Sequence, residues 1–92
     1  MRYRRCWRCG RNGVADPLDR HHIFGGPNRK KSDRLGLVVD LCHSQCHLYG
    51  PQAVHRNAET MRALRQYGQK KAMEENGWDV SDFIREFGRN YL

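Results

Sequence analysis

The segment Arg20–Gly26, with the sequence RHHIFGG, places two adjacent histidines just before a glycine-rich turn. Further along the chain, Leu37–Leu41 (LVVDL) is apolar, β-branched and of strand length. It runs directly into Cys42–His47 (CHSQCH). We therefore expect a β-hairpin followed by a short helix. In that arrangement the histidine pair lies on the first strand and His47 lies at the start of the helix, so that three imidazoles converge on one metal ion and its phosphate.

The two adjacent histidines should point in different directions. We expect a first strand over 18–24, and neighbouring residues on a strand face opposite sides, so His21 and His22 do not easily serve the same atom. This divergence suits phosphodiester cleavage, because the attacking water and the leaving oxygen lie on opposite sides of the phosphorus. Imidazole can bind a divalent metal or accept a proton near neutral pH. The alternative is a pair of surface histidines beside a basic run, and the third imidazole favours the catalytic interpretation.

The four cysteines form two pairs. Cys6 and Cys9 have the C-x2-C spacing of a zinc knuckle. After 32 intervening residues, Cys42 and Cys46 have the looser C-x3-C spacing. Four thiolates suit tetrahedral zinc, and such a closed set leaves no open coordination position, so we expect a structural rather than a catalytic zinc ion. His43 is a less suitable substitute ligand. Free thiols or a redox pair are the alternative.

Length and targeting signals limit the interpretation further. The 92 residues make one small domain, in which we expect a zinc-stapled core over 1–56 and a helical extension over 57–92. At this size a hydrophobic core is marginal without a metal, disulfides or a partner. We find no signal-peptide core and no membrane-spanning run. We therefore expect a cytoplasmic protein with no membrane partner, whose cysteines are metal ligands or free thiols rather than disulfides.

The positive charge is concentrated in the half of the chain that carries the histidine pair. The formal net charge is +7, and residues 1–35 hold ten Lys and Arg against three acidic residues, whereas the remainder is balanced. This distribution predicts a polyanionic partner, and nucleic acid is the best candidate. Arg29, Lys30, Lys31 and Arg34 come directly after the glycine turn, where they could hold backbone phosphates. The alternative is a solvated surface that only confers solubility.

The second half of the sequence predicts helices. Gly50-Pro51 should stop or kink the first short helix. Asn57 is a suitable N-cap for a long helix that ends at Asn76-Gly77, and a shorter helix should begin near Ser81 and end at Gly88. Apolar residues recur at helical spacing along both segments. The residues expected in the core are Met61, Leu64, Tyr67, Ala72, Met73, Phe83, Ile84 and Phe87, with Trp78, Tyr91 and Leu92 closing over the hairpin or the long helix.

The order of these motifs resembles a known family. A C-x2-C pair, a His-His strand, a hydrophobic strand ending in Leu-Cys and a Cys-His sequence resemble the HNH endonucleases of the ββα-metal (His-Me finger) class, in a zinc-stapled form. The phrase RHHIFGGPNRK and the ending FGRNYL resemble small HNH proteins of phages and prophages. The resemblance implies an α+β fold, with a zinc-stapled, treble-clef-like hairpin and helix and additional C-terminal helices.

The resemblance also implies roles for individual histidines. His21 corresponds to the member of the pair that binds a divalent metal, His22 to the general base, and His47 to the residue that completes the metal site. His55 is a further candidate ligand, and a surface histidine is its alternative. The implied cofactors are a structural Zn²⁺ and a catalytic Mg²⁺, Mn²⁺, Ni²⁺ or Zn²⁺.

The chain departs from the family at the middle Asn of the motif. Gly36-Leu37 occupies the place where many relatives carry that residue, which braces the hairpin loop. Asn28 lies earlier in the chain and is the candidate we retain for this role.

The residues and the resemblance together predict a metal-dependent DNA endonuclease that hydrolyses phosphodiester bonds and acts in the cytoplasm. The resemblance implies that it is encoded by a phage or prophage of a bacterial host. The resemblance implies DNA as a partner, and either genome packaging alongside phage terminase or packaging proteins, or homing, as the biological role. One alternative is a catalytically silent zinc-knuckle DNA-binding protein. Another is an RNA-binding zinc knuckle in which Trp7 and Tyr3 stack on bases. Of these, only the nuclease accounts for the three histidines together.

Overall fold

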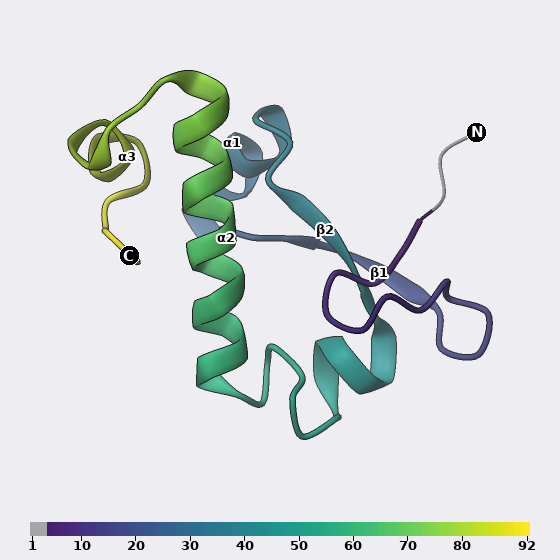
Figure 1. The fold of residues 1–92 in the computed structure, drawn as a ribbon. Coiled ribbons are helices and arrows are strands. Elements are labelled where there is room, and N and C mark those ends of the chain that lie inside the picture. Colours follow the sequence, from purple (N-terminus) through teal and green to yellow (C-terminus); the bar gives the residue numbers. More distant parts are fainter. Residues whose placement is uncertain (1–3) are drawn as a thin grey trace. The chain divides into compact units, whose positions relative to one another are not determined.

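The computed structural model of the chain describes residues 4–92, which include a two-stranded antiparallel hairpin and several helices (Figure 1). Tyr3 lies outside the described residues. The strands are β1 (Leu18–His22) and β2 (Val38–Cys42). The helical elements are the 3₁₀ turn η1 (Gly26–Asn28), α1 (Arg29–Arg34), the short π-helix η2 (His43–Leu48), α2 (Ala58–Asn76) and α3 (Val80–Phe87). The predicted α+β class is therefore confirmed.

Strand pairing continues one residue beyond both ends of β1. The backbone N–H of His43 donates to the carbonyl of Pro17 at 2.7 Å, and that of Ile23 donates to the carbonyl of Leu37 at 3.0 Å. The predicted first strand, 18–24, is thus two residues too long. The predicted second strand, 37–41, begins and ends one residue early. Because side chains alternate along a strand, Asp19 and His21 share one face of β1.

The basic segment after the glycine turn is helical, which the sequence analysis did not predict. Ser32 in α1 is completely buried, and its hydroxyl donates to the carbonyl of Phe24 at 2.7 Å. At the end of α1, the backbone N–H of Gly36 donates to the carbonyl of Asp33. The connection between the strands therefore has its own packed interior and is more than a surface turn.

The chain divides into two compact units that do not follow sequence order. The first comprises the chain up to His21 and Val38–Met61, and the second comprises His22–Leu37 and Arg62–Leu92. Each unit has its own buried residues. The first buries Cys6, Leu41, Cys42, Cys46, Ala53, Val54 and Thr60, and the second buries Ile23, Phe24, Ser32, Leu37, Leu64, Gln69, Ala72, Phe83 and Phe87.

An aromatic cluster forms the core of the second unit. The ring centroid of Phe24 lies 5.5 Å from that of Phe83, 4.8 Å from that of Phe87 and 5.4 Å from that of Tyr91. The buried side chain of Gln69 donates to Asn90 at 2.9 Å and accepts the backbone N–H of Tyr91 at 2.8 Å. The C-terminal residues are thereby fixed to α2, as the sequence predicted for Tyr91.

The predicted helix ends are largely correct. The side-chain oxygen of Asn57 accepts the backbone N–H of Thr60 at 3.1 Å, as an N-cap does. Gly88 ends α3 in the left-handed conformation, with φ of 88°. At the start of α3, Asp79 and Asp82 form a reciprocal capping box. The helix therefore begins at Val80, one residue before the predicted position.

Two of the predicted core residues are wrong, because Ile84 is 40% exposed and Tyr67 is 41% exposed. Leu92, which was expected to close over the hairpin or the long helix, is 44% exposed. In α3 the buried residues are Phe83 and Phe87, which lie one turn apart, and Ile84 is rotated about 100° away from Phe83 around the helix axis. Apolar spacing alone did not determine which face of each helix turns inward.

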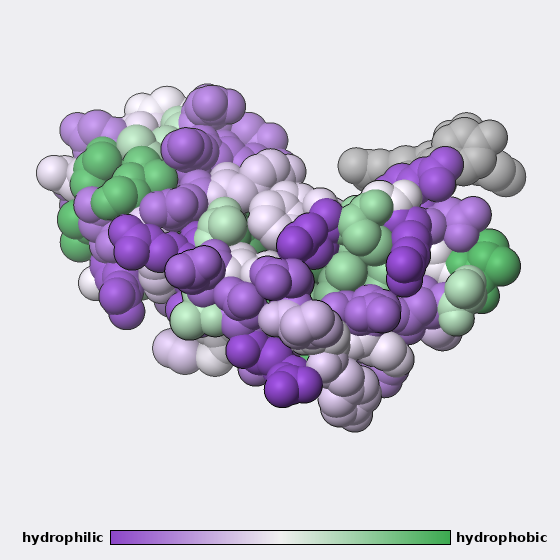
Figure 2. All heavy atoms as spheres, turned by 60° about the horizontal axis from the view of Figure 1, so that its bottom comes forward, coloured by the Kyte–Doolittle hydropathy of each residue, from purple (hydrophilic) through white to green (hydrophobic). Residues whose placement is uncertain are grey.

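The surface agrees with the low apolar content of the chain. Hydrophilic residues cover most of the face shown in Figure 2, with small hydrophobic patches between them. Among residues 4–92, we find no helix with the length and apolar character needed to span a bilayer.

Gly68 gives the first testable prediction. A methyl group at this position of α2 would lie 2.6 Å from Cγ2 of Ile23 and 3.0 Å from Cε2 of Phe24. Replacing a mid-helix glycine by alanine normally stabilises a protein by about 1 kcal/mol. We expect Gly68→Ala to destabilise the chain instead, because overpacking costs roughly 1–3 kcal/mol.

Thermal melting curves measure this effect. Lys70→Ala, at an exposed position of the same helix, should change the free energy of unfolding by less than about 0.5 kcal/mol. A rise in melting temperature for Gly68→Ala would show that the helix does not approach Ile23 this closely.

Candidate metal centres

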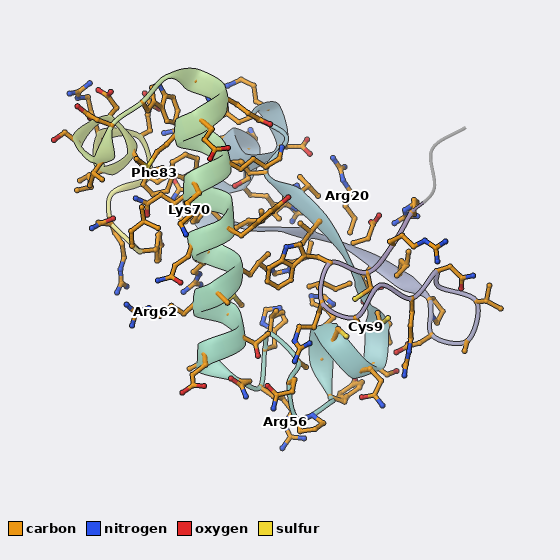
Figure 3. All side chains as sticks on the ribbon, viewed as in Figure 1. Cys9, Arg20, Arg56, Arg62, Lys70 and Phe83 are labelled. Atoms are coloured by element: carbon orange, nitrogen blue, oxygen red, sulfur yellow. The ribbon has the colours of Figure 1, made fainter. Side chains whose placement is uncertain are left out.

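The four cysteines form one cluster within the first unit. The four sulfur atoms lie within 4.8 Å of one another, and all four thiols are free. The sulfurs of Cys9 and Cys42 are 3.5 Å apart, close to the roughly 3.8 Å expected between two thiolates on one tetrahedral zinc ion. Sulfur atoms gather beside the labelled Cys9 in Figure 3. This donor set fits the predicted structural zinc.

Backbone hydrogen bonds bring the first cysteine pair to β2. The knuckle turn is closed by the N–H of Cys6, which donates to the carbonyl of Arg11 at 2.9 Å, and that of Gly10, which donates to the carbonyl of Cys6 at 2.9 Å. Cys6 also forms a parallel bridge with Asp40. The guanidinium of Arg4 binds the Asp40 carboxylate with two bonds, of 2.6 and 3.0 Å. The turn is thus held beside the strand that ends in Cys42.

The cysteine cluster accommodates thiolate charge unevenly. Burial acts to raise the pKa of Cys6, but backbone N–H groups of Cys42, Cys9 and Arg8 outweigh it and lower that pKa to about 7. Burial, followed by the neighbouring Cys9 and Cys6, raises the pKa of Cys42 to about 12. The same causes raise the pKa of Cys46. Without a cation, the cluster therefore holds a thiolate easily at Cys6 and keeps protons on Cys42 and Cys46.

Zinc uptake should accordingly be strongly pH-dependent. Near pH 7, Cys42, with a pKa of about 12, and Cys46, whose pKa is also raised, hold their protons. Binding as thiolates displaces both protons, so the apparent zinc affinity should rise by at least about 100-fold for each pH unit and fall equally as the solution is acidified. Competition with a chelator of known affinity, corrected for the chelator's own titration, measures this slope. An affinity that did not change with pH would exclude ligation by these two thiols.

Three histidines form a second cluster in the same unit. Their ligand nitrogens also lie within 4.8 Å of one another. The ring centroid of His21 is 5.2 Å from that of His47 and 5.5 Å from that of His55, and the latter two are 4.8 Å apart. Nitrogens bound to one zinc ion lie roughly 3.3 Å apart, so modest side-chain rotations would bring all three onto one ion.

His47 and His55 are positioned by a chain reversal. His47 was expected at the start of a helix, but η2 begins at His43, directly after β2, and His47 lies in its last turn. The chain then turns back, so that the N–H of Val54 donates to the carbonyl of Cys46 at 2.9 Å and that of His55 to the carbonyl of His47 at 3.2 Å. This pairing brings together two histidines that are eight residues apart.

Gly50 makes the reversal possible. Its backbone lies so close to the carbonyl oxygen of Gln45 that a side chain would collide with it. The sequence identified Gly50-Pro51 as a stop or kink, but it could not show that the chain returns to the carbonyls at the end of η2. The place of His55 in the cluster depends on that return.

Asp19 supports the histidine cluster and was not identified from the sequence. One of its oxygens, Oδ2, lies 2.9 Å from Nδ1 of His47 and 2.7 Å from Nδ1 of His43. Burial acts to raise the pKa of Asp19, but the hydrogen bonds from His47 and His43 outweigh it and lower the pKa below its usual value. A carboxylate cannot donate, so Nδ1 of His47 carries the proton and its Nε2 is left as the ligand atom. The available signal was the i, i+2 spacing from His21, which puts both side chains on one strand face.

Asp16 holds the start of η2. Its carboxylate accepts the backbone N–H groups of Ser44 at 3.0 Å and Gln45 at 2.9 Å. Both bonds lower the pKa of Asp16, and the bond from Ser44 has the larger effect. The residue acts as an N-cap supplied from a distant part of the chain.

His22 lies in the second unit and has a different partner. Its Nε2 is 3.4 Å from Oδ1 of Asp33, a residue of α1, and its side chain is largely buried. This contact agrees with the predicted divergence of the two adjacent histidines along β1.

The remaining candidates have different environments. Arg29, Lys30 and Arg34 are exposed on α1. Lys31, in contrast, donates to the carbonyl of Glu86, forms an ion pair with its carboxylate at 3.3 Å and lies over the ring of Phe87. The side-chain amide of Asn28 donates to the carbonyl of Phe87 at 3.4 Å. Lys31 of α1 and Asn28 of η1 therefore attach this segment to α3.

Comparison with known proteins identifies no relative, because no protein-family model, curated protein or solved structure matches this chain.

The Asp19 contacts predict a specific defect. Removing a carboxylate that orients a metal-binding imidazole typically weakens metal affinity 10–100-fold. We expect Asp19→Ala to weaken Ni²⁺ binding to the histidine cluster by about this factor, while the cysteine cluster retains its zinc. Calorimetric titration of Ni²⁺ into zinc-loaded protein measures the change. Asp33→Ala removes a carboxylate from His22 instead and should leave Ni²⁺ affinity unaltered. Equal affinities for Asp19→Ala and wild type would contradict the assigned tautomer.

Proposed function

We propose that this chain is a metal-dependent DNA endonuclease of the ββα-metal (HNH) type, which hydrolyses phosphodiester bonds. The observation that carries the proposal is the convergence of His21, His47 and His55, three imidazoles from separate parts of the sequence, on one small volume. The four cysteines already provide a structural metal site, so a separate all-histidine cluster favours a second, exchangeable metal ion with a different role. In this proposal the chain acts in the cytoplasm of a bacterial cell and is encoded by a phage or prophage, with packaging proteins such as terminase as partners.

The two clusters have different roles. The four cysteines hold a structural zinc ion in a treble-clef-like arrangement. The three histidines hold an exchangeable divalent ion, and because imidazole without carboxylate favours nickel or zinc, we expect these ions to bind better than Mg²⁺. When bound, the divalent ion supplies positive charge that stabilises the leaving oxygen of the phosphodiester.

His22 is the proposed general base. The carboxylate of Asp33 lies 3.4 Å from Nε2, and a negative charge there favours the tautomer with the proton on that nitrogen. Nδ1 of His22 is then left as an acceptor for a proton from the attacking water. Asp33 is the positioning residue in this scheme. It orients the base His22, just as the third group of a catalytic triad orients the base that activates the nucleophile.

DNA is the proposed substrate because of the basic first part of the chain. Arg29, Lys30 and Arg34 are exposed cations on one short helix, and contacts of this kind to phosphates dominate DNA affinity. Lys31 contributes less to binding in this proposal, because it is engaged by Glu86.

A catalytically silent DNA-binding protein is the second candidate. Asn28, the residue retained for the loop-bracing role, donates instead to the carbonyl of Phe87. A chain without that brace could retain the fold, the zinc and the charge while cutting nothing. Measurement of cleavage separates the two candidates.

The nuclease proposal predicts that three variants fail in three ways. His22→Ala should retain fold, metals and DNA affinity but nick plasmid DNA about 10²- to 10⁴-fold more slowly. His47→Ala should lose the exchangeable metal together with activity. Cys42→Ser should lose zinc and fold together, because structural zinc contributes roughly 10–16 kcal/mol in small fingers.

The measurements are metal content, a melting curve, a DNA-binding isotherm and a nicking rate for each variant with Ni²⁺, Mn²⁺, Zn²⁺ and Mg²⁺. Glu74→Ala, at an exposed position of α2, is the control and should retain nicking. If wild-type protein cuts DNA with none of these ions, the silent binding protein is the correct function. Wild-type rates for His22→Ala would mean that the base is another group.

A further inference from the structure

A hollow of about 190 Å³ lies on the first unit, beside the cysteine cluster. Its polar side chains are Arg8 and Arg11 from the knuckle turn, Gln45 from η2 and Gln52 from the loop that follows, and Cys9 and Cys46 also line it. The volume is several times the ~30 Å³ occupied by one water molecule in the liquid, so it can admit a hydrated anionic group. The nuclease proposal gives the two cysteines a zinc-binding role but assigns no role to the arginines or the glutamines.

Two arginines line the hollow without a carboxylate beside them. No acidic residue lines it. Arg4, a neighbour in sequence, is engaged by the carboxylate of Asp40 at 2.6 Å. Arg8 and Arg11, in contrast, form no side-chain hydrogen bond or ion pair with any residue in the described range 4–92. Two guanidinium groups are therefore available to a ligand.

The remaining groups favour an anion over a cation. The side-chain oxygen of Gln52 already accepts bonds from Asn57 at 3.3 Å and from Thr60 at 3.4 Å, so its NH₂ group is the part left to bind a ligand. The backbone that carries the two arginines is fixed by the hydrogen bonds that close the knuckle turn, each of 2.9 Å. The hollow thus presents donors on a rigid base.

We propose that this hollow is a phosphate-binding site in addition to the one proposed for α1. In it, Arg8 and Arg11 bind one backbone phosphate of the DNA. Guanidinium groups bind phosphate oxygens through paired hydrogen bonds, which lysine cannot do. The proposal rests on the proposed function for the identity of the polyanion. It adds a phosphate contact from the first unit to the contacts proposed for the cations of α1. The competing role for these arginines is to offset the charge of a zinc ion bound by four thiolates.

The test is the salt dependence of DNA binding by the double variant Arg8→Gln/Arg11→Gln. The double variant loses the contact to that one phosphate, which should reduce the slope of log affinity against log salt by about 0.9. The matched control, Lys71→Gln/Arg85→Gln, removes the same charge from residues already paired with Glu75 at 3.1 Å and Asp82 at 3.2 Å. Its slope should equal that of wild type. Zinc content and melting temperature are measured on the same samples.

Each outcome supports or overturns the site. A reduced slope with zinc content unaltered, seen in Arg8→Gln/Arg11→Gln but not in the control, supports it. An unaltered slope overturns the site and leaves the nuclease proposal intact, and an equal reduction in the control assigns the effect to net charge. Loss of zinc or of melting temperature in the arginine variant shows that the arginines serve the cysteine cluster instead. If wild-type protein shows no salt-dependent DNA binding, the proposed function itself fails.

Discussion

The antiparallel pairing of β1 with β2 is the constraint on which both clusters depend. Its register puts Asp19 and His21 on one face of β1 and ends β2 at Cys42, so that η2 starts where the sheet stops. A slip of one residue would move every side chain of β1 to the opposite face. His21 would then leave the histidine cluster, and Asp19 could no longer orient His47. The chemistry proposed for this chain thus rests on backbone hydrogen bonds more than on any single side chain.

The two units differ in what stabilises them. The second buries three phenylalanines with Leu64 and Ile23, an ordinary aromatic and aliphatic core. In the first, three of the buried residues are cysteines and two others, Ala53 and Val54, are small. Such a set removes little apolar area from water, and small units of this kind commonly need a metal or another cross-link. The raised pKa values of Cys42 and Cys46 fit a cluster whose like charges require a cation to coexist.

Much of the fold could be predicted from local patterns. The cap at Asn57, the stop at Gly88 and the opposed directions of His21 and His22 each follow from a few neighbouring residues. The face of α3 that turns inward could not be predicted, because Ile84 and Phe83 are equally apolar and only packing against Phe24 distinguishes them. The helical form of α1 was also missed, since its burial rests on Ser32, a small polar residue that carries no hydrophobic signal. In the candidate site, the roles of Asp19 and His55 depend on contacts across the hairpin and the chain reversal, which no local spacing encodes.

The reversal after η2 also bears on how the sequence can vary over evolution. Cys46 and His47 are adjacent in the chain, and their carbonyls accept the N–H groups of Val54 and His55 in the same order. The short segment that contains Val54 and His55 therefore fixes the backbone of one ligand from each cluster, Cys46 and His47. Substitution at an exposed position such as Tyr49 leaves that alignment intact, whereas insertion or deletion of a single residue between the paired segments shifts it. An insertion or deletion here would therefore disturb both clusters at once. The length of this loop should accordingly vary less than its composition.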